Sequence, residues 1–235
     1  MNGAVKDARF AIVAWALWLH RHRSDCTYSR GTDRYANLNR PGVLPFVGDC
    51  SSTLRDYYNW AGAPDPYRLG YNIPEGYTGT ELDAGHAITP GEVRVGDAVV
   101  YGPGTGWHTA LVVMRRGSDF LTMSMGGPGG PSLVWANPPE GPSLGCSYDG
   151  RLPQRWLAFD TETRSPRWPP GFTGSPSLFE AQRAGLRRLT LTDQSWFAEH
   201  GKTVWGWDGS WFIPEHVAPV LGMARWGAAN IVVGA

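Results

Sequence analysis

The segment between residues 96 and 126 constrains the fold most strongly, because it contains three short apolar runs separated by glycine-containing turns. The runs occupy residues 98–101, 108–114 and 120–125. Runs of this kind between such turns are typical of strands, and short connections join antiparallel neighbours. The sequence therefore predicts an antiparallel meander here, and residues 156–159 predict a further strand that closes the sheet.

A cysteine lies at the start of a predicted helix upstream of the meander. From Cys50 onward, apolar residues recur at helical spacing until Gly62 and Pro64 end the pattern. The backbone amides and the positive dipole end at a helix start lower the pKa of a thiol. A lone cysteine is most often a small buried apolar residue, but Asp49 and Ser51 surround this one with hydrogen-bonding groups. We therefore expect Cys50 to be a nucleophile.

A histidine at the head of the middle strand offers the matching base. Because side chains alternate between the two faces of a strand, one face carries His108, Ala110, Val112 and Met114. The imidazole therefore stands in line with a buried row and can face a helix packed across it. A lone histidine is usually structural, but together with Cys50 it would form the pair that cysteine hydrolases use for nucleophilic and acid–base catalysis.

The composition argues against partners that bind through net charge. Lysine plus arginine and aspartate plus glutamate both total 21, so the formal net charge is zero and favours neither nucleic acid nor an anionic membrane. Hydrophobic residues make up 42% of the chain, as in a protein with a buried core. The histidines have no spacing typical of metal ligands. We expect a monomer that needs no cofactor, binds no nucleic acid and does not insert stably into a membrane.

The three cysteines, Cys26, Cys50 and Cys146, cannot all be paired, so at least one thiol is free. Their wide spacing contains no CxxC motif and argues against a zinc site. We expect synthesis in a reducing compartment with Cys50 as a thiol. A Cys26–Cys146 disulfide formed after release from the cell is the alternative.

Two further segments indicate how the chain is organised. The apolar run at 10–19 is shorter than the roughly 20 residues that span a bilayer and lacks a convincing signal-peptide cleavage site. It predicts a core helix, and an export signal is the alternative. Residues 161–177 are rich in proline, glycine, serine and threonine. They predict a linker between a domain at 1–160 and a small module at 178–235.

The order and spacing of several motifs resemble the NlpC-type, papain-like cysteine peptidases of bacterial cell walls. The similarity is closest to the peptidase modules of endolysins from phages of actinobacteria. The motifs are GDCSS at 48–52, AGAPDP at 61–66, GY at 70–71, GYTGT at 76–80, GDAVVY at 96–101 and HTALVV at 108–113, with Thr27-Tyr28-Ser29 upstream. The resemblance covers roughly residues 5–160. It implies an α+β fold in which an antiparallel sheet packs against the helix that bears the cysteine.

The resemblance also assigns roles to individual residues. Cys50 becomes the nucleophile and His108 the general base. Tyr28 is a candidate side-chain donor to the oxyanion, beside backbone N–H groups at the helix start. Asp49 and Ser51 inherit a role in binding the free end of the substrate.

One position departs from the family pattern. Phage modules place a polar residue, often a histidine in a Ser-His-Gly run, on the strand after the catalytic histidine, and this chain has Ser124-Met125-Gly126. A thioether cannot hold an imidazole by a strong hydrogen bond. Either Ser124, a backbone carbonyl or a water orients His108, or the site is a dyad, or its activity is weakened.

The function that the resemblance implies is that of a phage endolysin, a peptidoglycan hydrolase that cuts between D-glutamate and diaminopimelate. The protein would be made in the host cytoplasm and act on an actinobacterial wall after release. One alternative is an N-acetylmuramoyl-L-alanine amidase on the same fold. Others are a wall hydrolase on a virion tail and a catalytically silent wall-binding protein.

The roles of two segments that contain tryptophan can each be interpreted in two ways. The tail has a helical pattern at 178–191, followed by Trp196, Trp205, Trp207, Trp211 and Trp226. Aromatic rings that stack on sugars would make it a wall-binding module, whereas large buried rings would make the same residues its core. The segment 126–145, with Trp135 and Asn137, is either a wall of the substrate groove or an ordinary surface loop.

Overall fold

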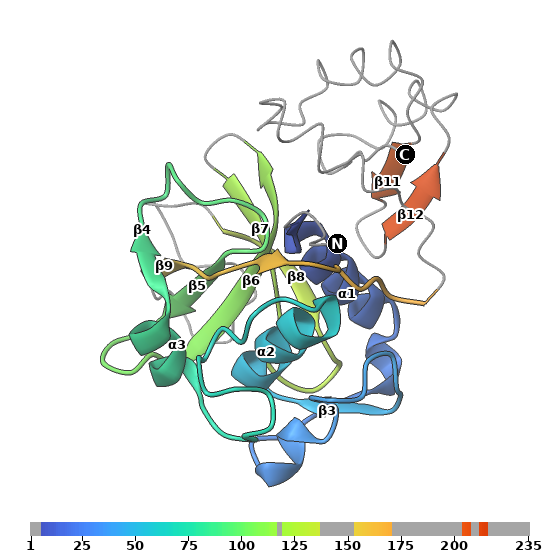
Figure 1. Cartoon of the computed structure of the whole chain (residues 1–235), viewed down its shortest axis with the longest axis horizontal. Coiled ribbons are helices and arrows are strands. Elements are labelled where there is room, and N and C mark those ends of the chain that lie inside the picture. The colour runs from blue at the N-terminus through green and yellow to red at the C-terminus, as the bar shows by residue number, and fades with distance from the viewer. Residues whose placement is uncertain (1–5, 117–118, 137–152, 171–203, 208–211, 216–235) are drawn as a thin grey trace. The chain divides into compact units, whose positions relative to one another are not determined.

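The computed structural model describes the chain except for residues 1–5, 117–118, 137–152, 171–203, 208–211 and 216–235 (Figure 1). The chain divides into two units, Met1–Pro170 and Gly171–Ala235. In the second unit, β11 (Val204–Trp207) pairs antiparallel with β12 (Phe212–Glu215). The predictions that fall outside the described residues are the helix at 178–191, Asn137, Cys146, Trp196, Trp211 and Trp226.

The first unit combines helices with an antiparallel sheet (Figure 1). Its helices are α1 (Arg9–Arg21), α2 (Cys50–Ala61) and α3 (Thr78–Ala84), with short 3-10 turns at Arg23–Asp25 and Thr32–Tyr35. The main sheet has the order β4-β9-β5-β6-β7-β8 and only antiparallel neighbours. Its strands are β4 (His86–Ile88), β5 (Ala98–Tyr101), β6 (His108–Arg116), β7 (Asp119–Ser124), β8 (Ser132–Ala136) and β9 (Pro153–Ala158). Two small pairs complete it: β2 (Cys26–Tyr28) is parallel to β3 (Phe46–Gly48), and β1 (Lys6–Asp7) is antiparallel to β10 (Glu162–Thr163).

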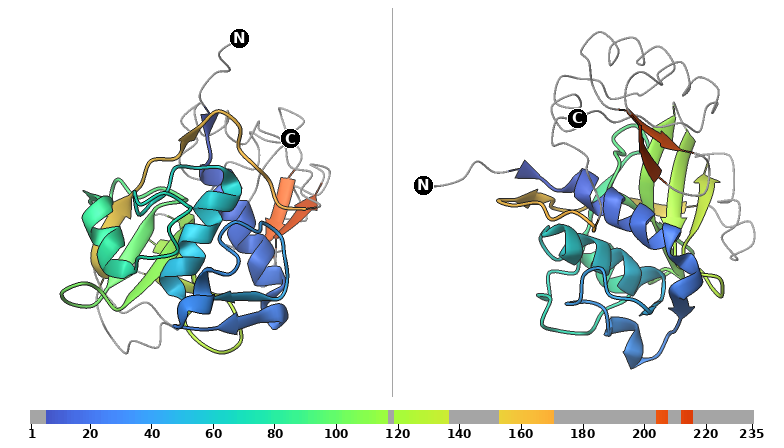
Figure 2. Two further views of the ribbon diagram at one scale, coloured as in Figure 1. Left: turned by 60° about the horizontal axis from the view of Figure 1, so that its bottom comes forward. Right: turned by 90° about the vertical axis from the view of Figure 1, so that its right-hand side faces the viewer.

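The predicted meander is confirmed, because β5, β6 and β7 are consecutive antiparallel neighbours. The apolar run at 10–19 forms α1 and is largely buried, as expected of a core helix. Both α1 and α2 lie on the same side of the main sheet (Figure 2), with the rings of Trp15 and Trp60 edge to face at 5.2 Å. Among the described residues, no helix combines the length and the apolar character needed to cross a bilayer.

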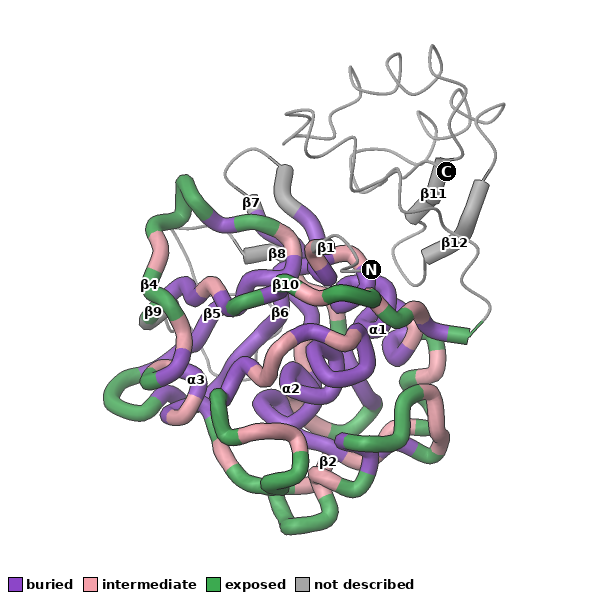
Figure 3. Tube along the Cα trace, in the orientation of Figure 1, coloured by how far each residue is buried: buried purple, intermediate pink, exposed green. Residues whose placement is uncertain are grey.

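Local sequence explains why α2 begins at Cys50. The Asp49 carboxylate accepts a hydrogen bond from the Ser52 amide at 2.8 Å, and the Ser52 hydroxyl accepts one from the Asp49 amide at 2.9 Å. This reciprocal cap satisfies two donors near the helix start. Gly62 ends the helix with a φ of 78°, which glycine adopts without strain. Because every residue of α2 is buried (Figure 3), the position of the thiol is fixed.

The side chains that follow His108 on its strand face pack against other strands and a loop. Ala110 and Val112 belong to a buried cluster whose other members come from strands and a loop: Val93, Val99, Tyr101, Phe120 and Trp156. Helix α2 contacts the opposite face, where the Tyr57 hydroxyl lies 3.9 Å from the sulfur of Met123. Met123 pairs with Leu111, the residue between the two cluster members on β6. A shift in register between Val112 and Met114 then interrupts the simple alternation of faces along β6.

Buried polar contacts tie both helices to the start of β5. Arg9 of α1 forms a buried ion pair with Asp97 and donates to the Val95 carbonyl at 3.2 Å. The Tyr58 hydroxyl of α2 donates to the Gly96 carbonyl. A side chain at Gly96, where φ is 83°, would come within 3.3 Å of Arg9. The Gly-Asp motif before β5 therefore has a structural role, which is to fix the helices on the sheet.

One guanidinium fixes the segment between α2 and α3. Arg55, which is fully buried, binds both carboxylate oxygens of Asp65 at 2.9 and 2.7 Å. It also donates to the carbonyls of Gly70, Ile73 and Glu75 at 2.9, 2.7 and 2.9 Å. This segment therefore follows a defined path even though it contains no helix or strand.

Candidate active site

Cys50, the first residue of α2, lies against the start of β6. Its residue surface is only 8% exposed, and the backbone N–H groups of Thr109 and Ser51 interact with its sulfur. Thr109 directly follows His108 in β6. The contact between α2 and β6 therefore brings the predicted nucleophile beside the predicted base.

A serine holds the imidazole of His108. Ser124, the last residue of β7, has its Oγ 2.7 Å from Nε2 of His108. The Tyr101 ring stacks on the imidazole with 6.1 Å between centroids and 28° between planes. A side chain at Gly126 would come within 3.5 Å of the ring. The plane of the imidazole is therefore defined from several sides. Met125, at the position where the modules that the sequence resembles carry histidine, is fully buried.

Burial keeps both the thiol and the imidazole neutral. Loss of water, and then the charge of Asp49, raise the pKa of Cys50 above its ordinary value, and the Thr109 and Ser51 amides do not offset this. Burial lowers the pKa of His108 to about 4, although Asp49 acts in the opposite direction. Burial and the charge of Asp49 therefore outweigh the lowering effect of the helix start on the thiol pKa. The base must take the thiol proton during the reaction itself.

Asp49 and Ser51, which we expected at the free end of the substrate, are engaged within the protein. One oxygen of Asp49 accepts hydrogen bonds from the Ser52 amide and, at 3.1 Å, from the Ser51 hydroxyl. The other oxygen forms an ion pair with Arg34 at 2.5 Å. Arg34, which the sequence patterns did not single out, also donates to the Gly76 carbonyl at 2.8 Å. Arg34 therefore compensates the negative charge of the carboxylate next to the nucleophile. Substrate binding by Asp49 and Ser51 stays a prediction.

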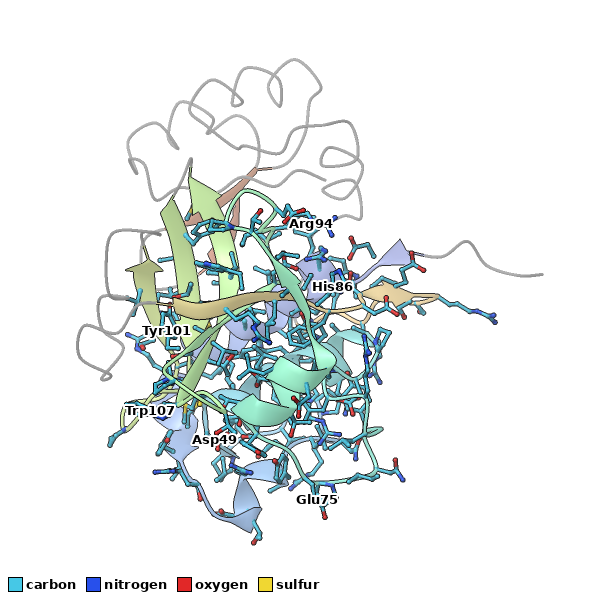
Figure 4. The ribbon with its side chains drawn as sticks, turned by 90° about the vertical axis from the view of Figure 1, so that its left-hand side faces the viewer. Asp49, Glu75, His86, Arg94, Tyr101 and Trp107 are labelled. Carbon is cyan, nitrogen blue, oxygen red and sulfur yellow. The ribbon has the colours of Figure 1, made fainter. Side chains whose placement is uncertain are left out.

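Tyr28 lies beside the strand that leads into α2. The parallel register of β2 and β3 places it opposite Gly48, two residues before Cys50. Its role as a donor to the oxyanion stays a prediction. Figure 4 shows Asp49 and Trp107, which precede Cys50 and His108 in the chain, towards the same end of the view, away from Arg94.

The sequence patterns also missed a buried acid near the pair. Glu81 of α3 is fully buried, and the Tyr67 hydroxyl donates to its Oε1 at 3.3 Å. Burial raises the pKa of Glu81 to about 8, against the opposing effect of the Thr109 hydroxyl. A single acid within a short helix carries no periodic signal, so only the tertiary contacts bring out its position.

Cys26 is a free thiol whose sulfur donates to the His22 carbonyl at 3.4 Å. Burial raises its pKa to about 12, so it is protonated at neutral pH. Within the part of the chain that the structure describes, no group of three His, Cys, Asp or Glu side chains could hold a metal ion.

A thiol at a helix start beside an imidazole on an adjacent strand defines the arrangement found in cysteine hydrolases. No protein-family model matches the chain. Over 84 residues the chain is 37% identical to the peptidoglycan endopeptidase RipB of Mycobacterium tuberculosis, in strain CDC 1551 / Oshkosh and in strain H37Rv. This match covers 35% of the chain and only 28% of RipB.

A solved structure of the peptidoglycan hydrolase RipB from Mycobacterium tuberculosis also matches. The two chains share 20% sequence identity with a TM-score of 0.35, over 64% of this chain and 65% of the other. The 84-residue segment therefore relates the chain to a hydrolase of the bacterial cell wall.

Proposed function

We propose that the protein is a peptidoglycan hydrolase on a papain-like fold, with Cys50 as the nucleophile and His108 as the general base. The observation that carries this proposal is that α2, which begins at Cys50, packs against β6, which begins at His108, so that the Thr109 amide acts on the Cys50 sulfur. Ser124 on Nε2 of His108 supplies the orienting group that a cysteine hydrolase needs. The segment shared with a peptidoglycan endopeptidase supports the substrate class.

The neutral state of the pair sets the order of proton transfers. With Nε2 engaged by Ser124, we assign the proton transfer from Cys50 to Nδ1 of His108. The sulfur then attacks the amide carbonyl, and the imidazolium gives its proton to the departing amine. Water hydrolyses the resulting thioester with His108 again acting as the base. Backbone N–H groups at the start of α2, with Tyr28 beside them, are the candidate donors to the oxyanion.

Within this class we propose an endolysin of an actinobacterial phage that cuts between D-glutamate and diaminopimelate. The ordered motifs around Cys50 and His108 support the phage module, and the mycobacterial relative named as an endopeptidase supports a bond within the peptide. On this proposal the protein is made in the host cytoplasm and reaches the wall on release.

The test is digestion of purified actinobacterial wall, followed by mass spectrometry of the soluble fragments. A new amine on diaminopimelate supports the endopeptidase, whereas a new amine on L-alanine identifies an amidase. Cys50→Ala should lower the rate by about 1,000-fold or more because the nucleophile is lost. Cys26→Ala is the matched control, since it removes another thiol of the same unit, and it should keep the parental rate.

Two outcomes would contradict the proposal. If the parent protein sediments with the wall but releases no fragment, the wall-binding alternative holds. If Cys50→Ala releases fragments as fast as the parent, the cysteine mechanism is wrong. Detection of the protein in purified virions would favour the virion-tail hydrolase over the endolysin.

A further inference from the structure

Two exposed aromatic rings lie next to the candidate active site. Among the described residues, the aromatic side chains that are exposed are Tyr77, which directly precedes α3, and Trp107, which directly precedes β6 and its first residue His108. They are 48% and 43% exposed. Burial of large rings stabilises a fold, and tyrosine and tryptophan at a surface are typical of binding interfaces. The two rings are therefore candidates for substrate contact.

A hydrogen bond joins the two segments that carry these rings. The Thr78 hydroxyl donates to the Gly106 carbonyl at 3.2 Å. Thr78 directly follows Tyr77, and Gly106 directly precedes Trp107. A side chain at Gly106 would come within 3.3 Å of Thr78, so the two segments are in close contact. Both rings therefore start from neighbouring stretches of main chain.

The same two segments are bonded to residues at the candidate active site. Arg34 donates to the Gly76 carbonyl at 2.8 Å and forms an ion pair with Asp49, which directly precedes the nucleophile. The Trp107 amide donates at 2.8 Å to the carbonyl of Tyr101, whose ring stacks on the imidazole of the base. Figure 4 shows Trp107 towards the end of the view where Asp49 lies. One ring is thus connected to the nucleophile side of the site and the other to the base.

Contacts with glycine fix both rings against the main chain. A side chain at Gly79 would come within 2.5 Å of the Tyr77 ring, and one at Gly102 would come within 2.9 Å of the Trp107 ring. The Tyr77 amide also donates to the Thr80 hydroxyl at 3.2 Å. Each ring is therefore supported by main chain on one side and still offers exposed surface. Rings held in this way lose little conformational entropy when a ligand stacks on them.

The chemistry of an aromatic ring selects one part of the wall polymer. The face of the ring is electron-rich, so it repels the carboxylates that the stem peptide carries at D-glutamate and diaminopimelate. A pyranose ring is uncharged and presents a flat face of C–H groups that is complementary to an aromatic face. We propose that Tyr77 and Trp107 form a subsite for a sugar ring of the glycan strand.

This subsite rests on the proposed function and extends it from the peptide to the glycan. Only L-alanine and D-glutamate separate the sugar from the bond that the protein is proposed to cut. Because two residues span roughly 7–10 Å, a sugar subsite has to lie close to the catalytic pair. Trp107, which adjoins the base in the chain, meets this requirement.

The first test compares two soluble substrates with the same peptide, a disaccharide muropeptide and the free stem peptide. Trp107→Ala and Tyr77→Ala should each lower kcat/KM about tenfold more on the muropeptide than on the free peptide, through a higher KM. Trp107→Phe and Tyr77→Phe keep a ring and should restore most of the difference. Ile73→Ala, at an exposed apolar residue of the preceding loop, is the control and should treat both substrates as the parent does. A loss of correctly folded enzyme cancels in the ratio between the two substrates.

The second test needs no hydrolysis. Tetra-N-acetylchitotetraose contains amino sugars without a peptide, and hydroxyl-radical footprinting followed by mass spectrometry measures the accessibility of each residue in the full chain. The sugar should protect Trp107 and Tyr77 from oxidation in a saturable manner and leave Leu69 and Ile73 as reactive as before.

Three results would overturn the sugar subsite. They are an equal loss of kcat/KM on both substrates, which would assign the rings to the peptide, no loss on either substrate, and failure of the sugar to protect either ring. Protection of both rings in a protein that cuts neither substrate would overturn the proposed function and support the subsite.

Discussion

The Ser124 hydroxyl lies 2.7 Å from Nε2 of His108, where the end of β7 meets the start of β6. Fully buried Met125 follows it directly. At Met125 the chain departs from the pattern of the peptidases that its sequence resembles, and a hydrogen-bonding group stands one residue earlier. On our proposal, Ser124 fixes the ring so that Nδ1 serves Cys50.

Ser124→Ala should lower the rate of wall hydrolysis by about tenfold, since one hydrogen bond to the imidazole is lost and the general base remains. The measurement is kcat on a soluble muropeptide. Ser132→Ala is the matched control, because Ser132 pairs with Ser124 across β7 and β8 and is exposed. Equal kcat values for the Ser124 variant and the parent would assign the orienting role to another group.

Hydrolysis should persist into acid. Because burial lowers the pKa of His108 from 6.5 to about 4, the imidazole stays neutral and able to accept a proton down to that pH. The acid limb of kcat/KM should therefore lie near pH 4. Between the two values the unfolded chain binds the additional proton, so stability should also fall as the pH is lowered through this range. A limb at pH 6.5 in the profile of kcat/KM would show that His108 titrates like a solvated imidazole.

Asp49→Asn should make Cys50 more acidic. Asparagine keeps an oxygen that can cap α2, but it removes the negative charge that raises the pKa of the thiol. The pH profile of Cys50 alkylation should therefore move to lower pH. Asp33→Asn is the control, because Asp33 is an exposed acid that accepts a hydrogen bond from the Ser29 hydroxyl at 2.5 Å. A profile that stays in place or moves to higher pH would contradict the role assigned to the Asp49 charge.

Arg55→Ala should destabilise the first unit by about 3 kcal/mol, because Asp65 would be left buried without its cation. A loss of this size corresponds to a melting temperature lower by roughly 5–10 °C. Thermal unfolding followed by circular dichroism measures it, with Arg40→Ala at an exposed position as the control. The melting temperature of Arg55→Lys should lie between those of Arg55→Ala and Arg40→Ala, since an ammonium group cannot reproduce the paired hydrogen bonds of a guanidinium. If Arg55→Ala and Arg40→Ala have the same melting temperature, the hydrogen bonds of Arg55 do not stabilise the fold.

The elements with a local signal could be predicted from the sequence. The meander follows from apolar runs between glycines, and α2 follows from the cap at Asp49 and the stop at Gly62. The proximity of Cys50 and His108 was expected because the motif order implied it. Ser124 was among the candidates because the sequence showed a polar residue next to an unsuitable one.

Features that depend on tertiary distance could not be predicted. Arg34 reaches Asp49 only because the 3-10 turn at Thr32–Tyr35 folds beside the start of α2. Glu81 is buried by packing that no sequence period records. The raised pKa of Cys50 could not be predicted, because the helix dipole is a local effect, whereas loss of water and the field of a neighbouring carboxylate depend on the whole surroundings.

The manner in which Arg55 holds the segment before α3 has a consequence for protein engineering. Three of its bonds go to main-chain oxygens, at Gly70, Ile73 and Glu75, which every amino acid provides. The exposed side chains of Leu69 and Ile73 can therefore be exchanged while the backbone keeps its course. The same segment is connected to Asp49, because Arg34 binds both the Gly76 carbonyl and the Asp49 carboxylate. Its exposed side chains could therefore be changed to suit a wall of different chemical composition while Cys50 and His108 stay in place.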